Sequence, residues 1–138
     1  MDTAKETILV ADDDSDLLDL LATTFGEKYH VLQAKDGAEA LQVARKELPH
    51  LVLLDIMMPR VSGLEIVREL QAEMETRAIP IILITGSNLD ETTENVLRDN
   101  VNVVSFLNKP CSLETLTRQV RSALDQRIAA ELEDELSA

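Results

Sequence analysis

Five polar side chains, each placed directly after a short apolar run, could carry out chemistry together: Asp12, Asp13, Asp55, Thr85 and Lys109. Carboxylates crowded at one point repel one another, and this repulsion raises a pKa unless a cation lies among them. A hard divalent ion with oxygen ligands, above all Mg²⁺, relieves the repulsion. The Thr85 hydroxyl and the Lys109 ammonium suit phosphoryl oxygens. The pattern therefore predicts Mg²⁺-dependent phosphoryl transfer.

Four consecutive apolar residues, Leu51 to Leu54, predict the element that positions Asp55. Such a run is typical of a strand buried on both faces, as in parallel sheets covered by helices. Asp55 then lies at the carboxyl edge of the sheet, where ligands bind in open α/β folds. Gly63 is expected to give the following loop a backbone angle that other residues resist. The alternative is a carboxylate that only closes a strand or caps a helix.

Short apolar runs alternate with amphipathic segments of helix length along the whole chain. This alternation is typical of repeating strand–helix units in a parallel sheet. Asp14 or Ser15 is expected to cap the first helix, and Asp36 to cap the second. The expected strands are residues 8–11, 29–34, 51–54, 80–84 and 103–107.

Length and composition favour one domain outside membranes. The 138 residues are 45% hydrophobic, which suits a single core. The formal net charge of −13 argues against binding to nucleic acid or anionic lipid, since both need clustered Lys and Arg. The single cysteine, Cys111, excludes an internal disulfide, and the charged N-terminus lacks a long apolar run. We expect a cytoplasmic protein with no membrane span.

From about Thr7 to about Leu124 the joint occurrence of these motifs resembles the receiver domain of a two-component response regulator. The resemblance implies a doubly wound, flavodoxin-like α/β fold, with a five-stranded parallel sheet of order 2-1-3-4-5 and helices on both faces. It implies that Asp55 is the phospho-acceptor, with Thr85 and Lys109 binding the phosphoryl oxygens.

The resemblance also implies a metal site and a switch. Asp13 and Asp55 would ligate Mg²⁺ directly, Asp12 largely through water, and the backbone carbonyl of Met57 would complete the protein ligands. Phe106 stands at the position of the family's rotating aromatic residue. The bond from Lys109 to the following proline is often cis in this family.

The implied function is a phosphorylation-controlled signalling switch, not an enzyme beyond assisting its own phosphorylation and dephosphorylation. A histidine kinase or a histidine phosphotransfer protein would donate the phosphoryl group. The response would change the face formed by the fourth helix, fifth strand and fifth helix, and so regulate a downstream protein. A weak homodimer is a further option, and no nucleic-acid contact is expected.

Two alternatives come from other classes of protein. Asp12 and Asp14 after a strand, Thr85 and Lys109 also resemble motifs of haloacid dehalogenase-like phosphatases. That family needs further carboxylates on a strand beyond the lysine, whereas the later acids here lie in helical sequence. The second alternative is an interaction module that does not use phosphorylation, against which the presence of all five site residues counts.

The segment 125–138 is expected to be an acidic helical extension or linker after a domain at 7–124. Ile128, Leu132 and Leu136 continue an apolar stripe in steps of four, which drifts away from the core-facing side. Acidic residues near a helix C-terminus are unfavourable. We expect the last helix to fray after about residue 130.

Overall fold

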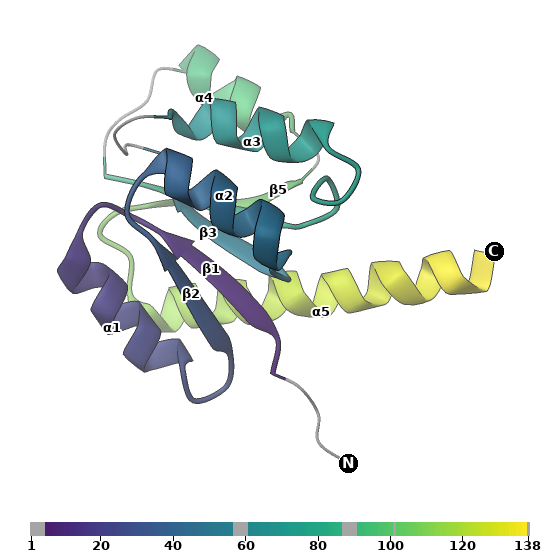
Figure 1. Ribbon diagram of the computed structural model, residues 1–138, viewed down its shortest axis with the longest axis horizontal. Helices are drawn as coiled ribbons and strands as arrows, with labels where there is room; N and C mark the ends of the chain where they lie inside the picture. Colours follow the sequence, from purple (N-terminus) through teal and green to yellow (C-terminus); the bar gives the residue numbers. More distant parts are fainter. Residues whose placement is uncertain (1–4, 57–60, 87–90, 101, 138) are drawn as a thin grey trace.

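The computed structural model describes residues 5–56, 61–86, 91–100 and 102–137. Its described residues form a parallel sheet in the order β2-β1-β3-β4-β5 (Figure 1), which confirms the predicted fold class. Because β1 and β3 are neighbours at its centre, residues that follow these two strands meet at the carboxyl edge. The strands are β1 (Thr7–Ala11), β2 (His30–Ala34), β3 (Leu51–Asp55), β4 (Ile81–Thr85) and β5 (Val103–Asn108).

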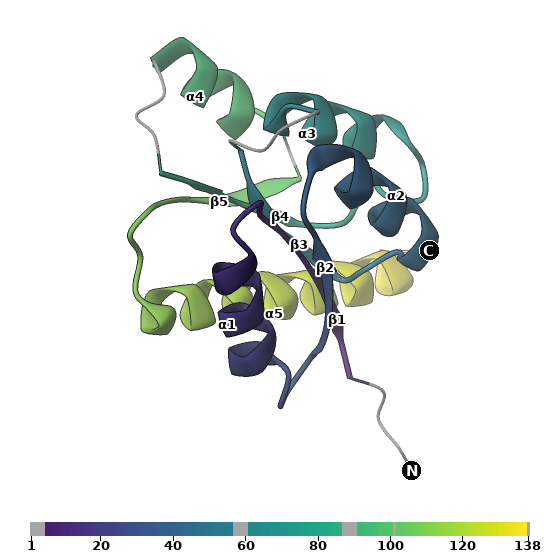
Figure 2. The same cartoon turned by 60° about the vertical axis from the view of Figure 1, so that its left-hand side comes forward.

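Helices cover both faces of the sheet. Helices α1 and α5 lie on one face and α2, α3 and α4 on the other, and Figure 2 separates these layers. The helices are α1 (Ser15–Phe25), α2 (Gly37–Glu47), α3 (Gly63–Ala72), α4 (Glu91–Arg98) and α5 (Leu113–Ser137).

Strand β3 is buried on both faces, as its apolar run predicts. Leu51 and Leu53 pack in the core layer under α1 and α5, whereas Val52 and Leu54 pack in the layer under α2, α3 and α4. Each such side chain contributes about 1.5–3 kcal/mol by leaving water. This packing fixes the strand, and it therefore also fixes the position of Asp55 at the end of the strand.

Two helix starts are capped by the aspartates that the sequence suggested. The Asp14 carboxylate accepts hydrogen bonds from the backbone N–H groups of Asp16 and Leu17, and the Asp36 carboxylate accepts one from Glu39. Such caps typically contribute about 1 kcal/mol. Asp14 and Asp36 thus have a structural role at helix ends.

Gly63 has a different role from the one expected. None of the described glycines has a positive φ angle, so an unusual backbone angle is not its purpose. A Cβ atom on Gly63 would lie 2.9 Å from the Cα of Ile56, closer than packed atoms allow. The missing side chain therefore lets the start of α3 approach the backbone directly after Asp55.

Helix α5 continues to Ser137, so the expected fraying after about residue 130 is wrong. Arg127 ties the extension to the domain, because its Nη2 bonds Glu6 Oε2 at 2.9 Å and its Nη1 bonds Glu131 Oε1 at 2.7 Å. The extension is also rich in Ala, Leu and Glu, which are strong helix formers.

The end of α5 extends beyond the sheet (Figure 1). Along it the exposed fraction rises from 42% at Ile128 to 53% at Leu132 and 86% at Leu136, as expected for a stripe that turns away from the core. The boundary between a domain at 7–124 and an extension at 125–138 remains a prediction. No helix in the described part of the chain is long and apolar enough to cross a membrane.

Candidate functional site

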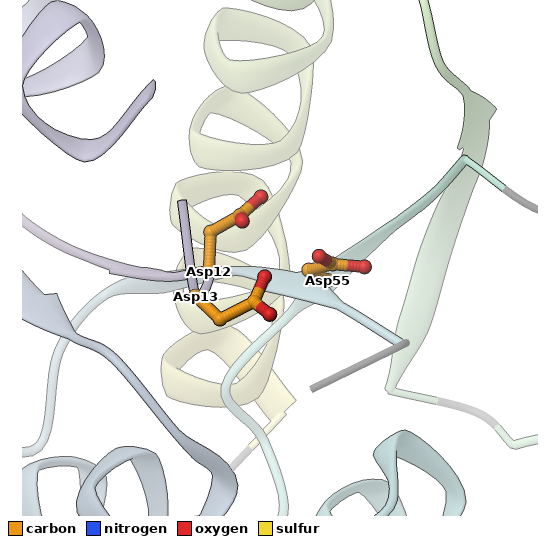
Figure 3. Close-up of side chains that lie close together, drawn as sticks. All are labelled: Asp12, Asp13 and Asp55. Carbon is orange, nitrogen blue, oxygen red and sulfur yellow. The ribbon is translucent and has the colours of Figure 1, made fainter. Parts of the chain in front are cut away.

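Three carboxylates meet at the carboxyl edge of the sheet. Asp12 and Asp13 follow β1 and Asp55 ends β3, and Figure 3 shows their side chains close together. One carboxylate oxygen from each lies within 4.8 Å of the others. Asp12 and Asp55 are only 3% and 5% exposed, whereas Asp13 is open to solvent. The cluster is thus buried at Asp12 and Asp55 and accessible to solvent at Asp13.

The register of the sheet explains this proximity. Ala11 on β1 pairs with Leu54 on β3, so the residues that follow them, Asp12 and Asp55, emerge side by side. The backbone N–H of Asp14 donates to Asp12 Oδ1 at 2.9 Å, which fixes the turn into α1. Asp12 therefore orders this loop as well as contributing charge, a role that the sequence analysis missed.

Lys109 brings a positive charge to the cluster from the end of β5. Its Nζ lies 2.9 Å from Asp12 Oδ2 and 3.3 Å from Asp55 Oδ2. Its backbone N–H donates to the Thr85 carbonyl at 2.7 Å, which places the lysine beside β4. The carboxylates are therefore bridged by an ammonium group, whereas the sequence analysis had assigned Lys109 only to phosphoryl oxygens.

Burial and charge act on Lys109 in opposite directions. Partial burial, the largest single influence, lowers the pKa of Lys109. The hydrogen bond to Asp12 and the charges of Asp55 and Asp12 together outweigh burial, so the pKa is raised above its ordinary value. Lys109 therefore stays protonated at neutral pH, as a group that binds anionic oxygens must.

Thr85 and Phe106 lie on the neighbouring strands β4 and β5. Thr85 ends β4, is 1% exposed, and directly follows Ile84, the partner of Asp55 in the sheet. Phe106 on β5 is half-buried and packs against the core layer under α2, α3 and α4. The structure thus places Thr85 beside the end of β3, and Phe106 one strand further along the sheet.

Two further expectations concern the loops around the site. The Lys109–Pro110 peptide bond is cis, as expected. Met57, the expected backbone ligand, lies outside the described residues.

The sequence analysis missed Arg98, a residue of α4 that contacts Phe106 on β5. Its guanidinium lies over the Phe106 ring, 4.8 Å from the ring centroid. The spacing of Glu94 and Arg98 predicts a helical ion pair, which the structure contains, but spacing within α4 carries no information about a ring on β5.

The donor set suits a hard divalent cation. Carboxylate oxygens are the ligands that such ions prefer, and the three oxygens lie close enough to share one ion. The solvent-open Asp13 leaves a side from which an ion or an anionic group can enter. The arrangement can therefore hold a divalent cation at an edge that is open to solvent.

Comparison with known proteins gives curated relatives that match most of this chain. Protein PilH of Pseudomonas aeruginosa is 34% identical over 118 residues, which cover 85% of this chain and 96% of that protein. The probable transcriptional regulator ycf27 of Pyropia yezoensis is 37% identical over 125 residues, covering 90% of this chain. The chain spans about half the length, 49%, of that regulator.

Solved structures share the fold. A chain described as adenylate cyclase from Rhodopirellula baltica superposes with a TM-score of 0.85 at 28% identity, covering 96% of both chains. The sequence also matches the family described as response regulator receiver domain over residues 8–121. That match takes in β1 to β5 and the first part of α5, so the chain belongs to the response regulator receiver domain family.

Proposed function

We propose that this chain is a signalling switch that accepts a phosphoryl group on Asp55 from a histidine kinase or a histidine phosphotransfer protein. The observation that carries the proposal is the junction of Asp12, Asp13 and Asp55 with Lys109 at one edge of the sheet. Family membership supports the phospho-acceptor role. The proposal includes the identity of the phosphoryl donor, the regulation of a downstream protein and the formation of a weak homodimer.

The transfer itself needs little covalent chemistry from the protein. A carboxylate oxygen of Asp55 forms a bond to phosphorus, the phosphorus–nitrogen bond of phosphohistidine breaks, and the electron pair goes to the imidazole nitrogen. Catalysis then consists of positioning the phosphoryl group and stabilising its charge. Lys109 supplies an ammonium group, and Thr85 a hydroxyl donor, for the phosphoryl oxygens.

Asp12, Asp13 and Asp55 would hold Mg²⁺, with Met57 offering its backbone carbonyl. When bound, the ion would neutralise charge on the phosphoryl oxygens. Two features of the chain itself hold the site in place. The Asp12 carboxylate fixes the β1–α1 turn, and the packing of β3 in both core layers fixes the position of Asp55.

Phosphorylation would add about one unit of negative charge at the end of β3. Lys109 and Thr85 would be drawn toward the new oxygens, and Phe106 would turn into the space beside Thr85. The surface of α4, β5 and α5 would change as a result. Reversing the two states from 1:99 to 99:1 would require about 5.5 kcal/mol of differential stabilisation.

The phosphatase alternative lacks a required part. It needs carboxylates on a further strand after Lys109, but in the described residues the chain continues as the single helix α5 from Leu113 to Ser137. The later acids therefore lie on helix α5 and not on a further strand.

The test is direct phosphorylation in solution. We expect incubation with Mg²⁺ and a small phosphodonor such as acetyl phosphate to add one phosphoryl group per chain, found on Asp55 by peptide mapping. Chelation of Mg²⁺ with EDTA should prevent the addition. Modification of another residue, or equal modification with EDTA, would contradict the proposal.

The metal site makes its own prediction. Mg²⁺ should raise the melting temperature, since an ion at 100 times its Kd stabilises the native state by about 2.7 kcal/mol. Asp13→Ala should remove this increase, because one of three carboxylates is lost, while the exposed position keeps the fold intact. Asp16→Ala, which removes an exposed carboxylate outside the cluster, should keep the increase. An unchanged Mg²⁺ response in Asp13→Ala would refute the assignment.

A further inference from the structure

Arg98 joins α4 to β5 through the ring of Phe106. Its guanidinium carbon lies 4.8 Å from the ring centroid, within the range of a cation–π interaction. Glu94 accepts hydrogen bonds from Arg98 Nε at 3.0 Å and Nη2 at 2.9 Å. Two bonds to one carboxylate oxygen restrict the guanidinium, so the carboxylate helps to hold the cation over the ring.

The same ring lies on the face of the sheet that carries Thr85. Leu83 pairs with Phe106 across β4 and β5, and Thr85 pairs with Asn108. Leu83 and Phe106 pack in the same core layer. Thr85 lies two residues beyond Leu83 and so faces the same side of the sheet. Phe106 is therefore a diagonal neighbour of Thr85 across β4 and β5, a separation that an aromatic side chain can span.

We propose that Arg98 is a positioning residue that holds Phe106 against α4 and thereby opposes the phosphorylated state. This inference rests on the proposed function and describes how the proposed switch is regulated. The guanidinium contacts the ring in the position that the structure shows, and a ring that turned toward Thr85 would leave it. A contact made in only one of two states stabilises that state. Arg98 thus sets how easily the switch responds.

The contact also links the position of the Phe106 ring to the position of α4. While Arg98 covers the ring, α4 is linked to β5 by this pair as well as by Leu97, which is fully buried in the same core layer as Phe106. Once the Phe106 ring leaves, the Arg98 guanidinium loses its partner on β5. Its ion pair with Glu94 remains, because both residues belong to α4. A change at Phe106 therefore reaches the α4 surface through Arg98.

A purely structural role for Arg98 predicts a different result. The side chain is 52% exposed, and a helical ion pair of this kind contributes little to stability. If the Glu94 pair were its only use, replacing Arg98 would slightly destabilise α4. The binding of a phosphoryl mimic at Asp55 would then stay unchanged.

The experiment measures binding of beryllofluoride, a stable phosphoryl mimic, in the presence of Mg²⁺. We expect Arg98→Gln to bind it about two- to fivefold more tightly than wild type, the range set by an exposed cation–π contact. Arg98→Lys keeps a cation near the ring and should lie closer to wild type. The position of the Phe106 ring, followed by NMR of a labelled phenylalanine, should shift toward the bound state in Arg98→Gln before ligand is added.

A double-mutant cycle isolates the ring contact. In a Phe106→Leu background, which has no π face, Arg98→Gln should leave beryllofluoride affinity unchanged. The same gain in both backgrounds, or no gain in wild type, would overturn the role of Arg98. Failure of wild type to bind beryllofluoride at Asp55 would instead refute the proposed function, so the two failures are distinguishable.

Discussion

Asp55→Asn should abolish phosphoryl uptake from a small phosphodonor. Asparagine has nearly the same shape, so the residue at the end of β3 should keep its place in a buried environment that is only 5% exposed. The amide lacks the anionic oxygen that would attack phosphorus. It also removes one of the two carboxylates that Lys109 contacts. Intact-mass measurement after incubation with Mg²⁺ and acetyl phosphate checks the result.

Asp14→Asn is the matched control for this prediction. It makes the same chemical change at an exposed aspartate of the same loop region, and asparagine caps a helix as well as aspartate does. Helix α1 should stay intact, and phosphoryl uptake should equal that of wild type. One phosphoryl group per chain on Asp55→Asn would show that the acceptor lies elsewhere.

The sheet and the residues at its edge follow from the sequence for simple physical reasons. A run such as Leu51 to Leu54 is stable only when both faces are covered, which requires a central parallel strand with helices on each side. Once the strands are parallel, their carboxyl ends share one edge, so Asp12, Asp55 and Lys109 are all expected along that edge. The strand order, which the resemblance to receiver domains implied, then sets β1 beside β3 and so brings Asp12 and Asp55 together.

Other features depend on contacts between distant residues, which periodicity does not contain. Glu6 and Arg127 are 121 residues apart, yet their ion pair anchors the extended α5. The need for Gly63 comes from the Cα of Ile56, not from its own φ angle. Arg98 covers Phe106 only because α4 packs over β5. Each contact depends on packing distances of a few ångströms, which a linear pattern does not specify.

Lys109→Met should slow phosphoryl transfer and make the protein depend on Mg²⁺ for stability. The ammonium group bridges Asp12 and Asp55, and methionine replaces it with an uncharged chain of similar length. Removing one preorganised charge at a reacting oxygen typically costs about 10²- to 10³-fold in rate. The loss leaves two buried carboxylates without this cation, and the free energy of unfolding should fall by about 1–3 kcal/mol, less than for a fully buried pair because Lys109 is partly exposed.

Mg²⁺ distinguishes this electrostatic effect from a packing defect in Lys109→Met. A divalent ion among the carboxylates would replace the missing charge, so Mg²⁺ should raise the melting temperature of Lys109→Met more than that of wild type. Lys35→Met, the same substitution at an exposed lysine, should match wild type in rate and in Mg²⁺ response. Thermal unfolding with and without Mg²⁺, together with phosphorylation time courses, measures both effects. An unchanged transfer rate in Lys109→Met would show that the ammonium group does not act on the phosphoryl oxygens.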